Sequence, residues 1–384
     1  MTQSDQSAFR IHDTRFLSIL GTTPTLDLLY ENTSYPFAHE AGIYLRSTNT
    51  LIVTSARLTE HIATDETPTQ TQPQPQKQSV RITRINLSTT PVSCSEIPTT
   101  IPMANGGVNA SPNDDNTVLI CGQGYLDSPS GIYSLSLTEP YESKLLVGSF
   151  YGRPFNSVND VVVHSDGSVW FTDPTYGFEQ GYRERPRLPS QVYRWCPPSS
   201  LSSSSFSSSS SSSGSTVVGE VAAGLRDRKI EVGKEEGSIR AMADGFGKPN
   251  GICFSPDEKT LYVTDTDWLV GDGRVDDARV SSIYAFDIST YHSSPFLTNR
   301  RLFAMTDSGI PDGIKCDLEG NVYSGCGDGI HVWSPGGVLL GRILIDGGVA
   351  NFCFGREGEI FALNEHRFWR VKLGGHVRGA LLGV

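Results

Sequence analysis

Short apolar runs alternate with turns rich in Gly, Asn and Asp along most of the chain. In the clearest example, Val161–Val163 is followed by a turn at Ser165–Gly167 and then by Val169–Phe171. Apolar runs of this length, bounded by turn residues, are typical of strands joined as antiparallel hairpins. The pattern therefore predicts a protein built mainly from short β-strands.

The same unit recurs along the chain. Each copy has a polar residue, an apolar strand, a turn and a second apolar strand, and the six copies begin at Glu40, Asn105, Asn159, Asn250, Asp312 and Asn351. A third strand follows every copy, and a fourth follows several, for example Lys144–Val147 and Val338–Ile343. Repeats of four antiparallel strands are the signature of a propeller. The predicted fold class is all-β, a six-bladed β-propeller of four-stranded antiparallel blades with a central channel, forming a single domain over residues 1–384.

Two segments interrupt the repeat without ending it. Residues 67–78 are rich in Pro and Gln, and residues 197–240 include an almost pure serine run from Ser199 to Ser213. Such segments bury too little apolar surface to offset the entropy lost on ordering, so we expect flexible surface insertions rather than domain boundaries. Inert variation in loop length is favoured over a binding role for both.

The charge and composition of the chain argue against several classes of partner. The chain has 31 Lys and Arg against 42 Asp and Glu, a net charge of −11, and its basic residues are scattered, so no nucleic-acid partner is expected. No apolar run approaches the roughly 18 residues of a membrane span, and Met1–Arg10 lacks an apolar signal core. The sequence therefore predicts a cytoplasmic protein with no membrane contact, and it indicates no protein partner. The 7 cysteines lack C-x-x-C spacing, which favours buried free thiols over disulfides or zinc.

The residues that begin the six copies are the candidate chemistry. In a propeller the first strand of each blade lines the channel and these strands run parallel, so we expect the six residues at one height around the axis. All of them are acids or amides. Oxygen ligands of this kind suit a hard divalent cation, and neutral amides on separate blades favour Ca²⁺ over Mg²⁺, while the lack of His and Cys disfavours zinc. Asn before a strand is also a common turn residue, and this alternative stays open for Asn105 and Asn351.

Three motifs resemble the regucalcin/gluconolactonase family of six-bladed propellers. They are Phe155–Val162 with Trp170–Gly177, Lys248–Gly251 with Phe254–Asp257, and Ile310–Gly313 with Asp317–Asn321. The stretch Ser157–Asp160 is also similar to the related paraoxonases. The resemblance spans Phe37 to Leu373 apart from the serine-rich segment.

The resemblance implies one divalent metal ion, usually Ca²⁺, held by four residues of this chain: Glu40, Asn159, Asn250 and Asp312. In some members the residue that matches Asn159 contacts the substrate or a metal-bound water instead. The chain departs from the family in two places, because the usual Glu-Gly-Pro is Glu40-Ala41-Gly42 and the arginine of regucalcin-like members is Ser157. The family's characteristic activity is the opening of small lactone rings, and a sugar lactone held by that arginine is not expected here.

These observations predict a calcium-dependent lactonase, a carboxylic ester hydrolase of the gluconolactonase type. The cation would polarise the lactone carbonyl, and Asp312 is the predicted catalytic residue, because it can bind the metal and accept a proton from the attacking water. The small lactone would contact three residues: Asn105, Asn159 and Tyr176.

Two other hypotheses remain open. One is a propeller isomerase or dehydratase acting on a small secondary metabolite, which would give a product of unchanged mass or one lighter by a water. The other is a non-catalytic propeller that binds a metal or small molecule, which a fully saturated metal shell would favour. Both remain open because one fold supports many functions.

Overall fold

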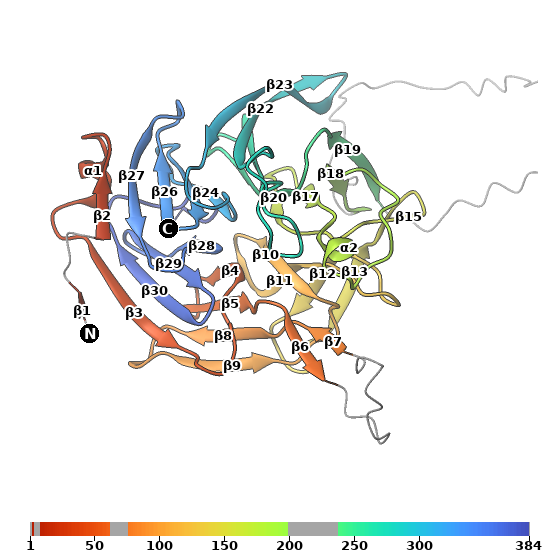
Figure 1. The fold of residues 1–384 in the computed structure, drawn as a ribbon, viewed down its shortest axis with the longest axis horizontal. Helices are drawn as coiled ribbons and strands as arrows, with labels where there is room; N and C mark the ends of the chain where they lie inside the picture. Colours follow the sequence, from red (N-terminus) through yellow and green to blue (C-terminus); the bar gives the residue numbers. More distant parts are fainter. Residues whose placement is uncertain (1, 4–7, 62–75, 199–236, 384) are drawn as a thin grey trace, which may run out of the picture.

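The computed structural model describes residues 2–3, 8–61, 76–198 and 237–383. Within these ranges almost all regular structure is β, and the two helices, α1 (Phe16–Leu20) and α2 (Tyr176–Glu179), are each shorter than two turns. Neither they nor any other described segment forms a helix long and apolar enough to cross a membrane. Six sheets of four or five strands surround a central axis (Figure 1), so the predicted six-bladed propeller is confirmed.

Each sheet is antiparallel, and its strands follow chain order from the axis outward. Sheet one holds β4 (Glu40–Leu45), β5 (Thr50–Thr54), β8 (Ile82–Asn86) and β9 (Ser93–Ile97); sheet two holds β10 (Ala104–Ser111), β11 (Asp114–Gly122), β12 (Gly131–Ser136) and β13 (Ser143–Val147). Sheet three holds β16 (Val161–Val163), β17 (Val169–Asp173), β18 (Gln191–Cys196) and β19 (Ser238–Ala243); sheet four holds β20 (Pro249–Phe254), β21 (Thr260–Asp265), β22 (Ser282–Tyr291) and β23 (Ser294–Met305). Sheet five holds β24 (Ile314–Cys316), β25 (Val322–Cys326), β26 (Gly329–Trp333) and β27 (Leu339–Leu344), and sheet six begins with β28 (Asn351–Phe354), β29 (Glu359–Asn364) and β30 (Arg367–Lys372).

The last two sheets are completed by strands from the beginning of the chain. β3 (Thr25–Glu31) pairs with β30 as the fourth strand of sheet six, and β1 (Thr2–Gln3) lies outside it. β2 (Phe9–Ile11) pairs with β27 and gives sheet five a fifth strand. Figure 1 shows these red strands beside the blue ones. The ring is therefore closed by hydrogen bonds between distant parts of the chain, which the six-copy repeat did not predict.

Contacts between the first strands define the channel. β4 contacts β10, and the contacts continue through β16, β20, β24 and β28 back to β4. The core lies between neighbouring sheets, where apolar side chains of one sheet pack on the next, as Trp170 of sheet three does on Phe254 of sheet four. Because the first strands run parallel around the axis, residues at the start of each strand meet at one end of the channel.

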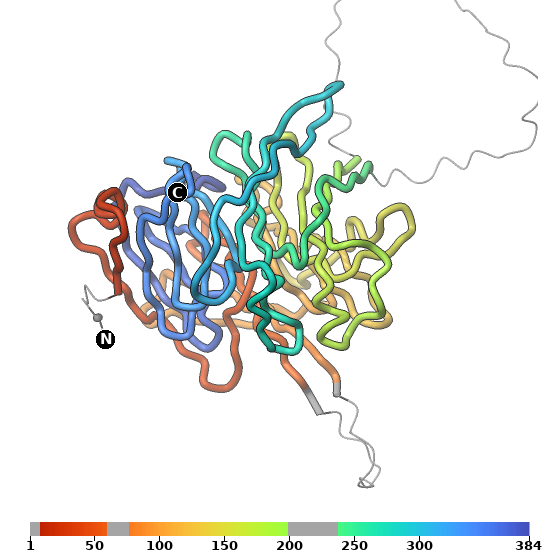
Figure 2. Tube along the Cα trace, turned by 45° about the horizontal axis from the view of Figure 1, so that its top comes forward, coloured from red at the N-terminus to blue at the C-terminus, as the bar shows by residue number. Residues whose placement is uncertain are grey.

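The two predicted insertions fall mainly outside the described residues, which leave out 62–75 and 199–236. At one edge of each predicted insertion the structure has a strand. Gln76–Ser79 forms β7, which pairs with β6 (Leu58–His61), and Ser238–Ala243 is β19, whose Ile239 is buried in the core. Both segments belong to hairpins or sheets because their backbones find a neighbouring strand. The β6–β7 hairpin and the long β22–β23 hairpin extend beyond the ring (Figure 2).

Two minor features complete the fold. A separate short hairpin joins β14 (Ser149–Phe150) to β15 (Arg153–Pro154) before sheet three. All seven cysteines are free, as predicted, and all but Cys94 are buried.

Candidate active site at one end of the channel

The four predicted metal ligands occupy equivalent positions on four sheets. Glu40 is the first residue of β4 and Asn250 the second of β20, while Asn159 and Asp312 lie two residues before β16 and β24. The side chains of Glu40, Asn159 and Asn250 are buried, and Asp312 is half-buried. We call this part of the channel the Glu40 end. The repeat therefore gives these four residues the same place in their sheets.

Two side-chain oxygens at the Glu40 end are buried without a hydrogen-bond partner. They are Oδ1 of Asn159 and Oδ1 of Asp312. Leaving a buried acceptor without a donor costs about 1–3 kcal/mol, so such atoms are uncommon unless something else satisfies them. A cation between the two would do so, and both are the hard oxygen donors that Ca²⁺ prefers. The residues present thus fit an oxygen-liganded divalent metal.

The pKa values of the carboxyl groups at the Glu40 end also favour a bound cation. Burial raises the pKa of Glu40 to about 8, with a further contribution from the negative charge of Asp312. Burial likewise raises the pKa of Asp312 to about 6, and a hydrogen bond from the Asn250 amide acts in the opposite direction. Two carboxylates that disfavour each other's charge would be stabilised by a positive ion, which would lower both pKa values and displace protons.

His39 contributes a positive charge beside these carboxylates. Its Nδ1 lies 2.6 Å from Oε1 of Glu365. Burial acts to lower the pKa of His39, but the charges of Glu365, Glu40 and Asp312 together raise it to about 10. The histidine is therefore an ion-paired neighbour of the site rather than a metal ligand. Among the described residues, no three His, Cys, Asp or Glu side chains cluster as a metal site, so a metal held here would need amide oxygens as well as the two acids.

Asn351 holds Glu40 in place. Its Nδ2 donates to Oε2 of Glu40 at 2.6 Å, and its Oδ1 accepts from the backbone N–H of Phe352 at 2.8 Å. Both ends of the Asn351 carboxamide are used within the protein. Asn351 therefore orients the glutamate and bonds its own backbone. This favours the interpretation as a turn residue over the interpretation as a metal ligand.

Asn105 and the residue after it connect sheet two to both neighbours. The hydroxyl of Thr54 donates to the carbonyl oxygen of Asn105 at 3.0 Å, and the N–H of Gly106 donates to the carbonyl oxygen of Asn159 at 2.9 Å. A Cβ on Gly106 would lie 2.5 Å from that same oxygen, so only glycine allows this approach. The close contact fixes the height of Asn159 in the channel.

In sheet three, Thr172 and Asp173 at the end of β17 position two different asparagine segments. The Thr172 hydroxyl donates to the carbonyl oxygen of Asn250 on the next sheet at 2.7 Å. The Asp173 carboxylate accepts from the N–H groups of Asn156 at 3.0 Å and Ser157 at 2.8 Å, just before Asn159. Burial raises the pKa of Asp173 to about 7, and these two backbone hydrogen bonds act to lower it.

Sheet four repeats the arrangement. The Thr264 hydroxyl donates to the carbonyl oxygen of Asp312 at 3.1 Å. Asp265 accepts from the N–H groups of Gly247 at 3.0 Å and Lys248 at 2.8 Å, just before Asn250. Sequence reasoning assigned no role to these Thr-Asp pairs. The signal was present, because the same dipeptide ends the second strand of two successive copies.

Tyr176 lies at the start of α2, above Asn250. Its hydroxyl contacts the Thr266 hydroxyl and lies 3.4 Å from Nδ2 of Asn250, and burial raises its pKa. The tyrosine therefore anchors the Asn250 carboxamide beside Asp312. Ser157 is also engaged, because its hydroxyl donates to the carbonyl oxygen of Pro174 at 2.8 Å and accepts from the N–H of Gly177 at 3.0 Å.

Comparison with known proteins now gives the family. Residues 32–360 match the model of the family described as SMP-30/gluconolactonase/LRE-like region. The chain belongs to this family. The matched range contains all four predicted ligands, and the family is the one that the sequence motifs resemble.

Individual relatives of the family are distant. The chain is 26% identical over 258 residues to a gluconolactonase of Zymomonas mobilis, covering 63% of this chain and 58% of that protein. It is 27% identical over 269 residues to lactonohydrolase oryL of Aspergillus oryzae, covering 65% of this chain and 51% of that protein. The match thus spans between half and three-fifths of the length of these two relatives.

Solved structures share the fold. A gluconolactonase from Xanthomonas campestris superposes with a TM-score of 0.65 at 24% identity, covering 95% of this chain and 94% of that one. A calcium-binding protein, regucalcin, from Agrobacterium tumefaciens superposes with a TM-score of 0.54 at 13% identity, covering 90% and 92%. At these identities the likeness establishes the propeller fold of the family alone.

Proposed function

We propose that the protein is a metal-dependent lactonase whose active site is the Glu40 end of the channel. The names of its relatives, gluconolactonase and lactonohydrolase, support this reaction class. The observation that carries the proposal is the pair of buried oxygens without donors on Asn159 and Asp312, beside a glutamate whose pKa burial raises to about 8. If these residues were only turn residues, their side-chain oxygens would accept hydrogen bonds from their own backbone.

The metal would be held by Glu40, Asn159, Asn250 and Asp312, with Ca²⁺ as the ion that suits this oxygen donor set. When bound, it would supply a positive charge that polarises the lactone carbonyl and stabilises negative charge on its oxygen in the transition state. The amides add no charge, so the ion would keep its attraction for the carbonyl. Asn351 would keep Glu40 oriented through its 2.6 Å hydrogen bond.

Asp312 is the proposed catalytic residue. Its Oδ1 is buried without a hydrogen-bond donor, so the ionised carboxylate could both bind the ion and accept a proton from the attacking water. The Thr264 hydroxyl fixes its backbone, and the Asn250 amide donates to its carboxylate. These contacts would hold the accepting oxygen in place while the ester bond of the ring breaks and the ring oxygen takes a proton.

The substrate is a small lactone that does not depend on an arginine for recognition. Ser157 replaces the arginine of regucalcin-like members, and its hydroxyl is already bonded to Pro174 and Gly177. Asn105 and Asn159 would contact the substrate from the channel wall, and Tyr176 would act mainly through Asn250. We therefore expect γ- or δ-lactones with few hydroxyl groups to be preferred over sugar lactones.

A screen of γ- and δ-lactones with a pH indicator tests the proposal, because ring opening releases a proton. Each lactone is assayed in chelator and after addition of Ca²⁺, Mg²⁺, Mn²⁺ or Zn²⁺, with wild-type protein and with Asp312→Asn. We expect turnover that chelator abolishes, Ca²⁺ restores and the variant lacks, with a product heavier by one water. Saturable Ca²⁺ binding without turnover of any lactone would favour a binding protein, and a product of unchanged or lower mass would favour an isomerase or dehydratase.

A further inference from the structure

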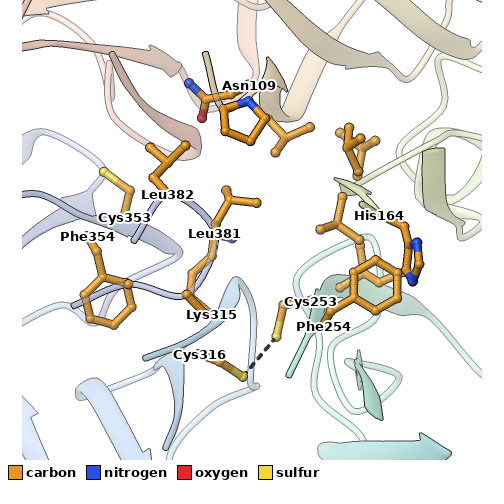
Figure 3. Close-up of a pocket in the computed structure, with 18 of the residues that line it drawn as sticks. Asn109, His164, Cys253, Phe254, Lys315, Cys316, Cys353, Phe354, Leu381 and Leu382 are labelled. Atoms are coloured by element: carbon orange, nitrogen blue, oxygen red, sulfur yellow. Dashed lines mark hydrogen bonds between the residues drawn. The ribbon is translucent and has the colours of Figure 1, made fainter. Parts of the chain in front are cut away.

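A cavity lies at the opposite end of the channel from Glu40. It has a volume of about 710 Å³ and is lined by the last residues of first strands, such as Val163, Phe254 and Phe354, and by Gly379–Leu382 near the end of the chain. Figure 3 shows Leu381 and Lys315 toward the middle of this cavity, with Asn109, His164, Phe254 and Cys353 around them. We call this part of the channel the Lys315 end. Its volume is that of a small-molecule site.

The walls of this cavity are mostly apolar. Side chains from all six sheets contribute, including Ile43, Val108, Val162, Ile252, Cys316 and Cys353. The thiols are free, and burial raises the pKa of Cys353, so they act as neutral apolar surface. Surfaces of this composition exclude sugars and other strongly hydrated molecules, because few wall groups could replace the hydrogen bonds lost from water.

Lys315 is the exception in these walls. It is the middle residue of β24 and is half-buried. Within the described part of the chain, its ammonium group makes no hydrogen bond and no ion pair. Its positive charge interacts with the buried carboxylate of Asp160 and with the buried thiols of Cys316 and Cys353, so it acts toward the channel interior.

Acidic residues at the rim do not neutralise this lysine, because they are bonded elsewhere. Glu258 accepts from the N–H of Ser165 at 2.8 Å and lies 3.4 Å from Nε2 of His164. Asp257 accepts from the Ser255 hydroxyl at 2.7 Å. The cavity therefore combines a large apolar volume with one unpaired cation, and an unpaired cation in such surroundings is costly unless an anion joins it.

We propose that the Lys315 end is a binding site for a small amphipathic carboxylate, a molecule with one anionic head and an apolar body. The carboxylate pairs with Nζ of Lys315, and the apolar body fills the space between the first strands and Leu381. A molecule with several charges does not fit, because the cavity offers a single unpaired cation. This site is separate from the Glu40 end and does not depend on the reaction proposed there.

Decanoate and the matched neutral probe 1-decanol test this assignment by isothermal titration calorimetry on the full chain. We expect saturable binding of one decanoate, weakened about tenfold or more by Lys315→Met and kept within about threefold by Lys315→Arg, since a charge-assisted pair contributes more than a neutral contact. Binding of 1-decanol should be weaker and unaffected by either substitution. Circular dichroism and thermal unfolding check that both variants fold.

Several results would overturn the assignment. They are the absence of saturable decanoate binding to wild-type protein, equal affinity of wild-type and Lys315→Met for decanoate, and equal affinity of wild-type for decanoate and 1-decanol. A variant that fails to fold would be replaced by a wild-type titration at increasing salt, where an ion pair predicts weaker decanoate binding and unchanged 1-decanol binding. Lactone turnover is measured in parallel, and a loss of decanoate binding without loss of turnover keeps this proposal distinct from the lactonase proposal.

Discussion

The same six strands build both ends of the channel, yet the two ends are opposite in chemistry. The Glu40 end has buried oxygens that lack donors on Asn159 and Asp312, and the Lys315 end has an unpaired cation among apolar side chains. A propeller makes this possible because it gathers equivalent strand positions from every sheet at one height. The Glu40 end lacks a positive partner for its oxygens and the Lys315 end lacks a negative partner for its lysine. The first therefore suits a cation and the second an anion.

The two ends also differ in how they are held. At the Glu40 end, directional hydrogen bonds hold the backbone near the proposed ligands. The Thr172 hydroxyl bonds the backbone of Asn250 on the next sheet, and the Asp173 carboxylate bonds the backbone of Ser157, just before Asn159. At the Lys315 end, the side chains are held mainly by apolar packing. Geometry fixed by directional bonds is more sensitive to single substitutions than a packed wall. Changes at the Glu40 end should therefore have the larger effects on activity.

Asp312→Asn should have the largest effect. The substitution keeps the shape of the side chain but removes the charge that would bind the metal and accept the proton, so lactone turnover should fall by about 10³-fold or more. Calcium affinity measured by calorimetry should fall with it. Stability should change little, because Asp312 also bonds through backbone atoms, at 2.9 Å to Gly325 and 3.1 Å to Thr264, and the oxygen of an asparagine can still accept from the Asn250 amide.

The matched control for that experiment lies at the other end. Lys315→Met should leave kcat/KM for the same lactone within about twofold, because Lys315 is not part of the proposed reaction site. A turnover that survives in Asp312→Asn, or that disappears in Lys315→Met, would remove the functional distinction between the two ends.

Asp173→Asn should have the next largest effect. An asparagine has one acceptor oxygen, and its amide would face an N–H of Asn156 or Ser157, so one hydrogen bond becomes a repulsive contact. We expect a loss of about 1–3 kcal/mol in the free energy of unfolding and a fall of about 10–100-fold in kcat/KM, because Asn159 loses its support. Urea denaturation and steady-state kinetics measure both.

Asp265→Asn in sheet four should behave in the same way, since it removes the equivalent support from Asn250. Asp257→Asn at the rim of the Lys315 end is the control, because that exposed carboxylate bonds Ser255 and Lys259 and no other residue of the described ranges. Its expected loss is less than about 1 kcal/mol, with unchanged turnover. Equal losses of turnover in all three variants would mean that the carboxylates of the Glu40 end have no special role.

The stability of the metal-free protein should depend on pH. The pKa values of Glu40, Asp173 and Asp312 are raised to about 8, 7 and 6, so the folded state holds protons more tightly than the unfolded state. That contribution is complete below the ordinary carboxyl pKa values and is lost as pH rises through the folded values. In chelator, the urea midpoint should therefore fall between pH 5 and pH 8.

Added Ca²⁺ should reverse this trend at the Glu40 end. The ion binds the ionised carboxylates, so the gain in midpoint on adding Ca²⁺ should be larger at pH 8 than at pH 5. A gain that is equal at both pH values would argue against Glu40 and Asp312 as ligands. Decanoate is proposed to bind at the Lys315 end, so the gain in urea midpoint on adding it should not depend in this way on the ionisation of Glu40 and Asp312.

Sequence alone was enough for the parts of the molecule that repeat. Glu40, Asn159, Asn250 and Asp312 begin four of the six copies, and rotation about one axis gives equivalent positions the same place in each sheet, so the pattern predicts that they converge. Closure of the ring was missed because β3 lies outside the repeat and pairs with a strand more than 300 residues away, for example Asp27 opposite Arg370. No local pattern indicates such a pairing.

The Lys315 end was missed for a different reason. Its residues, such as Val162 and Ile252, have the ordinary apolar pattern of buried strands, and Lys315 reads as a solvent-facing strand position. Their enclosure depends on ring closure and on the path of Gly379–Leu382. Asn351 was left undecided because its two possible roles differ only in which atoms its carboxamide meets, and these are fixed by the neighbouring Glu40 and Phe352.

Thr172→Val and Thr54→Val should have the smallest effects, and they separate support of a ligand from support of the ring. Each hydroxyl donates to the carbonyl oxygen of a residue that starts a copy on the next sheet, Asn250 at 2.7 Å and Asn105 at 3.0 Å. Thr54→Val removes one buried hydrogen bond and should cost about 1 kcal/mol in the free energy of unfolding. Thr172→Val also removes the bond that its hydroxyl accepts from the N–H of Asp160 at 3.1 Å, so its cost should be about 2 kcal/mol. Only Thr172→Val should also weaken Ca²⁺ binding, by a few-fold, because Asn250 is a proposed ligand and Asn105 is not. Calorimetric Ca²⁺ titration of the two variants decides this, and equal affinities would mean that the hydroxyls hold the sheets together without positioning the metal site.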